Sequence, residues 1–180
     1  ELSDALKLKG IKLTSETDTE IIPHLVSLEI EKALANGLST CEQTLLTSVQ
    51  KVLKIIKGTY AIAVIWSKAP NSLVVARGQA PLILGFGEGE FFCASDIPAL
   101  EGFTRTFLPL RDHEIALLTP LGIELYDEDG NRQHRAPSAL KGTELFADKR
   151  NFRHFMLKEI YEQPEKTQLW IDMFLPMDLA

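Results

Sequence analysis

Cysteine is scarce in this sequence of 180 residues: Cys41 and Cys93 are the only two. They are far apart and belong to no CxxC or Cys/His pattern, so the sequence excludes a disulfide framework and a zinc site of the usual spacing. No apolar run is long enough to cross a bilayer, and no signal-peptide pattern is present. The net charge is −6 and Lys and Arg form no block, which excludes a basic surface of the kind that binds nucleic acid. We expect a cytoplasmic protein that binds neither nucleic acid nor membrane and needs no metal or other cofactor.

What is present predicts a single α+β domain. Hydrophobic residues make up 45% and charged residues 24% of the chain, which is typical of a soluble globular domain with a sizeable core. Apolar residues recur at helical spacing over residues 21–36 and again over residues 39–57. Short β-type segments separated by turns follow from residue 59 to about residue 130. Because these strands do not alternate with helices, a mostly antiparallel sheet is expected.

Several local patterns carry more specific expectations. "IKLTS" alternates apolar and polar residues and predicts a short strand, whereas "TYAIAVIWS" is apolar throughout and predicts a strand buried on both faces. Residues 132–151 are polar and irregular and predict a loop or linker. "FRHFMLKEIYEQP" predicts a helix that stops at Pro164. The apolar tail that follows, with Trp170, Ile171, Met173 and Phe174, is expected to dock on another domain or chain.

The most informative stretch is "SETDTEIIPHLV", which begins at Ser15. Thr17 followed by Glu20 three residues later has the spacing of a capping box, in which two side chains close the start of a helix. Asp18 lies between them, and acids are common at this position because they favour the helix dipole. From the residues alone, Asp18 is better explained as part of the helix start than as a ligand.

Other candidates for chemistry are weaker. "GFGEGE" lacks the spacing of a phosphate-binding loop and predicts a tight hairpin around Gly85, Gly87 and Gly89. Cys93 follows two phenylalanines and has no nearby histidine, which makes it a poor nucleophile. The four histidines are scattered, and no pair has metal-binding spacing.

Four stretches together resemble one family. "SETDTEIIPHLV", "GTYAIAVIWS", "APLILGFGEGEFFCASDIPAL" and "FRHFMLKEIYEQP" are similar, in order and spacing, to the glutaminase domain of glutamine–fructose-6-phosphate aminotransferases, and most similar to cyanobacterial members. The resemblance implies an N-terminal-nucleophile hydrolase, an αββα four-layer sandwich. It identifies residues 1–150 as the C-terminal portion of a type 2 glutamine amidotransferase domain and residues 151–180 as a helix and linker toward a sugar-isomerase domain.

The resemblance also implies site residues and partners. Asp18 matches the family acid that contacts the α-ammonium of bound glutamine, and Tyr161, Glu162 and Gln163 match the start of the interdomain linker. Glutamine and, through the isomerase domain, fructose 6-phosphate are the implied ligands, and a homodimer is the implied assembly of the whole enzyme. The family segments "CGIVG", "HTRWATHG" and "HNGI", which carry the nucleophile, the carboxylate clamp and the oxyanion hole, do not occur in these residues. No catalytic residue is therefore assigned, and the chain alone is expected to be inactive, as a fragment whose domain lacks its N-terminal part.

Two alternatives remain open. One is a non-catalytic binding or assembly module derived from the same fold, and the other is the related purine-pathway amidotransferase. "KEIYEQP" followed by an apolar linker fits the sugar enzyme better than the purine enzyme.

Overall fold

The computed structural model describes residues 2–139 and 151–174, which fall into two compact units, Glu1–Gly142 and Thr143–Ala180. The first unit contains, in addition to nine strands, the helices α1 (Leu2–Leu8), α2 (Ile21–Ala35) and α3 (Glu42–Leu53) and the 3-10 turns η1 (Asp18–Glu20) and η2 (Ile97–Ala99). The strands are β1 (Tyr60–Ile65), β2 (Leu73–Gly78), β3 (Ile83–Phe86), β4 (Phe91–Ala94), β5 (Thr106–Pro109), β6 (Ile115–Thr119), β7 (Gly122–Tyr126), β8 (Arg132–Gln133) and β9 (Ser138–Ala139). The second unit contains helix α4 (Phe155–Phe174).

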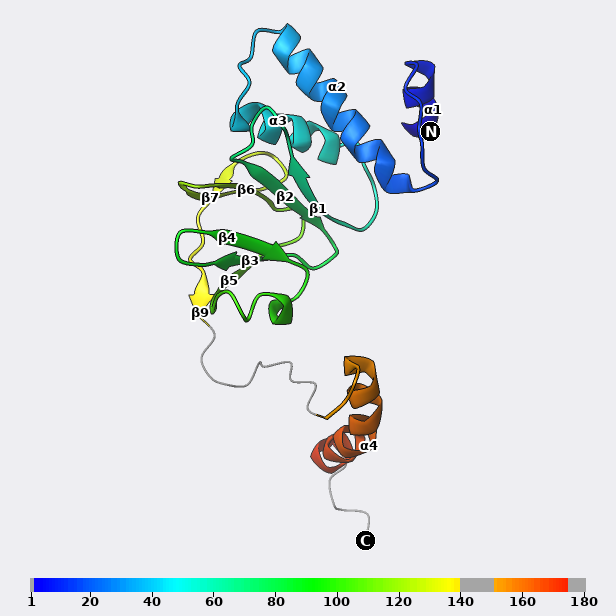
Figure 1. Ribbon diagram of the computed structural model, residues 1–180, viewed down its shortest axis with the longest axis vertical. Helices are drawn as coiled ribbons and strands as arrows, with labels where there is room; N and C mark the ends of the chain where they lie inside the picture. The colour runs from blue at the N-terminus through cyan, green and yellow to red at the C-terminus, as the bar shows by residue number, and fades with distance from the viewer. Residues whose placement is uncertain (1, 140–150, 175–180) are drawn as a thin grey trace. The chain divides into compact units, whose positions relative to one another are not determined.

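The strands of the first unit form two antiparallel sheets. One has the order β1-β2-β6-β7-β8 and the other the order β4-β3-β5-β9, and every strand pair is antiparallel. Figure 1 shows α2 and α3 over one face of the first sheet, with the second sheet on its other side. The α+β class with antiparallel sheets is confirmed, and the layers follow the helix–sheet–sheet order of an αββα sandwich.

Two hydrophobic clusters hold these layers together. Between the helices and the first sheet, Val26 and Ile30 of α2 pack with Leu45 and Val49 of α3 and with residues of β2 and β6. Between the two sheets lie Val75, Leu82, Leu84, Leu108, Leu110, Ala116, Leu118 and Leu125. Successive residues of β2 and β6 alternate between the two clusters, since side chains on a strand point to opposite faces. Both strands are therefore buried on both faces.

The expectation that the "TYAIAVIWS" strand is buried on both faces is wrong. β1 is the edge strand of its sheet, and its residues alternate between half-buried and exposed. Tyr60, Ile62 and Val64 pack on the helix side, whereas Ile65 is 79% exposed. A continuous apolar run does not distinguish an edge strand from a central one, because here the outward positions of the strand are also filled by apolar residues.

Three other local expectations are corrected. Residues 11–15 form no strand, because no described strand pairs with them. Part of the polar stretch after residue 131 pairs as β8 and β9, although residues 140–150 lie outside the described range. Helix α4 does not stop at Pro164 but continues to Phe174. Glu162 forms an ion pair with Lys166 (3.0 Å) that spans the proline and another with Lys158 (3.6 Å) in the turn before it. Such pairs at i,i+4 spacing support a helix that lacks one backbone hydrogen bond.

Candidate functional site

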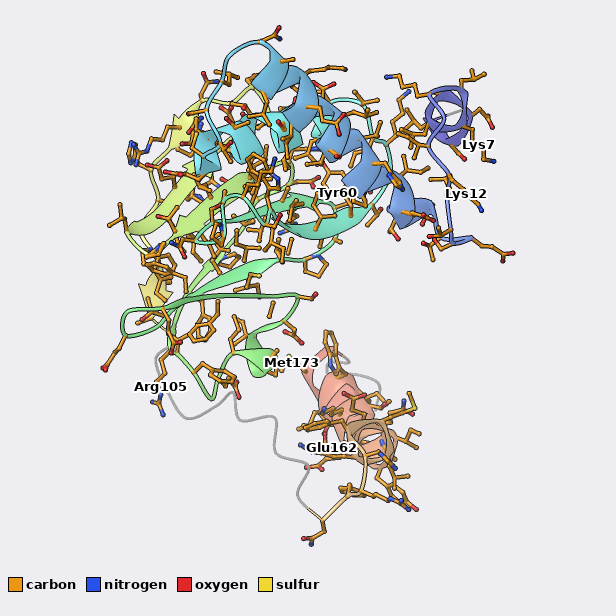
Figure 2. All side chains as sticks on the ribbon, turned by 45° about the horizontal axis from the view of Figure 1, so that its top comes forward. Lys7, Lys12, Tyr60, Arg105, Glu162 and Met173 are labelled. Atoms are coloured by element: carbon orange, nitrogen blue, oxygen red, sulfur yellow. The ribbon has the colours of Figure 1, made fainter. Side chains whose placement is uncertain are left out.

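The loop that leads into α2 carries the acid singled out by the sequence. Residues 9–17 connect α1 to η1, and Lys12 lies on this segment in Figure 2. Helix α2 then begins directly after η1. Pro23, its third residue, is tolerated there because the first backbone N–H groups of a helix have no partner within the helix.

Asp18 is the first residue of η1 and is exposed to solvent. Within the described ranges, its carboxylate makes no hydrogen bond and no ion pair, although the backbone around it is ordered into a turn. A carboxylate with no partner among the described residues is available to a cationic group from outside. Its chemistry suits an ammonium ion, which offers N–H donors and a positive charge.

The predicted capping box is wrong in its geometry. Thr17 is the N-cap residue of η1, but its side chain makes no capping hydrogen bond. In a capping box the Glu20 carboxylate would accept a hydrogen bond from the backbone N–H of Thr17, but here it contacts residues earlier in the chain. It accepts hydrogen bonds from the N–H groups of Thr14 (2.7 Å) and Ser15 (2.7 Å) instead. The loop curls so that these two donors converge on Glu20, which sequence spacing alone does not reveal.

Glu20 also accepts from the two hydroxyl groups of the same residues. The distances are 3.0 Å from Thr14 Oγ1 to Oε1 and 2.6 Å from Ser15 Oγ to Oε2. These bonds, with the Ser15 hydroxyl the largest contributor, lower the pKa of Glu20 from its ordinary value of 4.5 to about 2. Glu20 therefore stays ionised near neutral pH, and both of its oxygens are engaged by the loop.

The two cysteines have opposite environments, and both are half-buried. Burial in β4 raises the pKa of Cys93. Cys41 is the N-cap residue of α3, where hydrogen bonds, first from the Ser39 hydroxyl and then from Thr44, lower its pKa. Cys41 borders a cavity of about 390 Å³ together with residues 68–72 and 119–121. Asp18 is not among the residues that line this cavity.

A second cavity of about 360 Å³ lies at the start of β1. Tyr60, Lys54, His113 and Glu128 line it, and burial, followed by the charges of Asp112 and Glu128, raises the pKa of Tyr60. His113 lies between Asp112 and Glu128, at 3.7 Å and 3.9 Å. Within the described residues, no group of three metal-ligating side chains occurs here or elsewhere, and Asp18 is not among the residues that line this cavity.

The linker residues lie on α4, in the second unit. Tyr161 is 68% exposed, and its ring packs on that of Phe152 at a centroid distance of 5.5 Å. Glu162 forms the two ion pairs described above, and Gln163 is exposed. Figure 2 shows Glu162 and Met173 on this helix. Trp170, Ile171 and Met173 are exposed, as the sequence predicted, while the side chain of Phe174 lies outside the described set. None of the helices searched within the described residues is both long and apolar enough to span a membrane.

Comparisons with known proteins confirm the resemblance. A family model described as a glutamine amidotransferase domain matches residues 1–102. The glutamine–fructose-6-phosphate aminotransferase (isomerizing) of Thermosynechococcus vestitus is 46% identical over 179 residues, which cover 99% of this chain and 28% of the relative. That of Synechocystis sp. is 48% identical over 174 residues, covering 97% of this chain and 27% of the relative. The chain thus spans a little over a quarter of the length of these curated relatives.

The solved structures bear on the fold alone. Glutamine phosphoribosylpyrophosphate amidotransferase from B. subtilis, complexed with ADP and GMP, superposes with a TM-score of 0.57 at 22% identity. The match covers 73% of this chain and 27% of that one. It confirms the expected fold, the layered sandwich of N-terminal-nucleophile hydrolases, for the part of the chain that it covers.

Proposed function

Because this chain belongs to the glutamine amidotransferase domain family, we propose that it is part of a glutamine–fructose-6-phosphate aminotransferase. Such an enzyme, a glutamine-fructose-6-phosphate transaminase (isomerizing), makes glucosamine 6-phosphate from fructose 6-phosphate and glutamine. Residues 1–150 would belong to the glutaminase half, which releases ammonia from glutamine. The identity of 46–48% to relatives with this name, over nearly the whole chain, supports the assignment.

The role of Asp18 is to hold the α-ammonium group of glutamine. The observation that carries this proposal is a solvent-facing carboxylate that has no partner among the described residues and lies in an ordered turn. An ammonium–carboxylate hydrogen bond is charge-assisted and about twice as strong as a neutral one. A fixed carboxylate also selects α-amino acids over ligands that lack the ammonium group.

The nucleophile is assigned to a group other than the two cysteines present. Acyl transfer from a side-chain amide needs an activated nucleophile beside an oxyanion site. Cys93 is disfavoured because burial raises its pKa. Cys41 lies at the start of α3, and the cavity beside it is not lined by Asp18. This chain therefore supplies a substrate contact, and no catalytic residue is placed in it.

Residues 151–180 are proposed to lead toward the domain that binds fructose 6-phosphate. Tyr161, Glu162 and Gln163 would lie at the contact between the two domains. The many exposed apolar side chains of α4 support this role, since Met156, Tyr161, Trp170 and Met173 are each at least 65% exposed. In the whole enzyme such residues are expected to be covered by the neighbouring domain or by the second subunit of a homodimer.

The test begins with the intact mass and N-terminal residue of the natural protein that carries this chain. A protein much larger than 20.1 kDa that starts with cysteine and hydrolyses glutamine would support the proposal. In that protein, Asp18→Asn should raise the KM for glutamine about 10- to 100-fold, as expected for the loss of a charged hydrogen bond. A natural protein of this length that binds no glutamine would instead favour the binding or assembly module.

A further inference from the structure

We propose that Glu20 is a positioning residue: by closing the loop of residues 14–20 it holds Asp18 where the α-ammonium group of an amino-acid substrate binds. The inference rests on the proposed function, because it assigns Glu20 a role that is exerted through Asp18. Glu20 itself would not touch the substrate.

The hydrogen bonds of Glu20 carry the inference. Each of its two oxygens accepts one backbone N–H and one hydroxyl, all from Thr14 and Ser15, at 2.6–3.0 Å. The Ser15 hydroxyl is in turn 2.8 Å from that of Thr17. Glu20 thus joins the two ends of a short loop, and Asp18 lies two residues before the carboxylate that closes it.

The contrast between the acids of this loop shows a division of roles. The carboxylate of Glu20 is saturated by internal donors, and the imidazole of His24 also lies near it, with Nε2 3.6 Å from Oε1. In the described structure, Asp18 and Glu16 have no hydrogen-bond partner and are exposed. A ligand ammonium would find Glu20 already engaged, whereas Asp18 is available. The internal bonds of Glu20 instead restrict the conformations of the loop that carries Asp18.

Replacing Glu20 by glutamine would keep its size and break part of this closure. The amide NH2 group can only donate, so it would face a backbone N–H that also can only donate. A hydroxyl can turn to accept, but the N–H cannot. One end of the loop would lose its partner, and Asp18 would spend less time in the binding position. Substrate affinity would fall without any direct contact being removed.

The experiment measures the KM and kcat for L-glutamine in the natural protein, together with the binding of 4-carbamoylbutanoate, the analogue that lacks the α-amino group. Glu20→Gln is expected to raise the KM for glutamine about tenfold while kcat changes little. The affinity for the analogue should stay within twofold, because the analogue has no ammonium group for Asp18 to hold. Glu16→Gln is the matched control: it removes the same charge from the same loop and should leave both constants within twofold.

The double variant separates positioning from a general structural effect. If Glu20 acts through Asp18, adding Glu20→Gln to Asp18→Asn should raise the glutamine KM no further. A further rise equal to that of the single variant, or an equal loss of affinity for the analogue, would overturn the positioning role. If Asp18→Asn raises the glutamine KM and Glu20→Gln does not, the positioning role is overturned as well and the role of Asp18 stays intact. A silent Asp18→Asn would overturn the proposed ammonium contact, and the positioning role with it.

Ser15→Ala keeps the inference testable if Glu20→Gln does not fold. This variant removes the hydroxyl that joins Glu20 to Thr17 and leaves the backbone N–H bonds in place. The expected result is a rise in glutamine KM of about two- to fivefold, with binding of the analogue unchanged. An unchanged glutamine KM in a folded Ser15→Ala protein would contradict the inference.

Discussion

Tyr60 and Gly78 lie directly opposite each other on the β1–β2 pair, and the Tyr60 ring covers the glycine. A Cβ atom at Gly78 would come within 2.5 Å of two ring atoms. The ring therefore occupies the space that a side chain at position 78 would need. The close approach of an aromatic ring to a glycine in the neighbouring strand is a known means of fixing strand register.

Gly78→Ala is accordingly expected to destabilise the protein. The methyl group would force the Tyr60 ring out of its packing against the helices, at a cost of about 1–3 kcal/mol. Gly102→Ala is the control, because a Cβ there would meet nothing within 4 Å, and its effect should stay within about 0.5 kcal/mol. Denaturant unfolding of both variants gives the comparison. Equal stability of the two would show that the ring moves aside without cost.

The buried ion pair of Glu114 and Arg135 leads to a second prediction. Glu114 is 5% exposed and also accepts a hydrogen bond from the backbone N–H of Arg111 at 2.7 Å. Arg135 is half-buried, and its guanidinium also donates to the carbonyl of Pro109. Glu114→Ala leaves this guanidinium without its anionic partner and the Arg111 N–H without its acceptor, so it should cost about 1–3 kcal/mol. Arg132→Gln, which breaks the exposed pair with Glu124, should cost no more than about 1 kcal/mol. Chemical unfolding measures both, and a cost below about 1 kcal/mol for Glu114→Ala would contradict the prediction.

Sequence patterns predicted the parts of the fold that depend on local spacing. The helical spacing of α3 and the tight hairpin around Gly85, Gly87 and Gly89 were predicted because neighbouring residues alone determine them. The strand expected over residues 11–15 failed because a strand also needs a partner, and the burial of β1 failed because exposure depends on which strand lies at the edge. Both errors concern long-range pairing, which a local period does not report.

At the candidate site, too, the sequence pointed to the residues but not to contacts that depend on the path of the chain. Asp18 was singled out by its motif and the resemblance; the structure shows that it is exposed, and its contact with glutamine stays a prediction. Glu20 was also noticed, but as half of a capping box with Thr17. Its true partners, Thr14 and Ser15, depend on the path of the loop, which no spacing rule contains. The excess of hydroxyl residues before Glu20 was the one available signal, since such groups are donors for a carboxylate.

The hydrogen bonds of Glu20 predict a specific acid transition. Because its pKa in the folded protein is lowered from 4.5 to about 2, the stabilisation it provides is fully present above pH 4.5. That stabilisation is lost as the pH falls through about 2. The amide resonances of Thr14 and Ser15 should therefore shift with a midpoint near pH 2. Ser15→Ala should move this midpoint upward, since the Ser15 hydroxyl is the largest cause, and a midpoint near 4.5 in the unaltered protein would contradict the hydrogen-bonded loop.

The continuation of α4 through Pro164 gives a further prediction. Proline in a helix interior costs about 3 kcal/mol relative to alanine. In α4 one ion pair of Glu162 precedes the proline and the other spans it. Carbon chemical shifts of residues 165–174 should be helical in the unaltered chain, and Pro164→Ala should increase their helicity. Gln163→Ala, at the neighbouring position, should have little effect. Coil-like shifts after residue 164 would instead support the helix end predicted from the sequence.

The exposed edge of β1 predicts that the 180-residue chain associates with itself. β1 ends its sheet and presents unpaired backbone groups together with Ile65, whose side chain is 79% exposed. Such an edge favours pairing with a strand of another molecule, and a charged side chain on it opposes that pairing. At high protein concentration, Ile65→Lys should therefore have a lower average mass in light scattering than the unaltered chain. Leu121→Lys is the matched control, because Leu121 is fully exposed but lies in the turn between β6 and β7. If both variants reduce association equally, exposed apolar side chains in general are responsible. If the unaltered chain is monomeric, the edge of β1 does not pair with other molecules and the prediction is wrong.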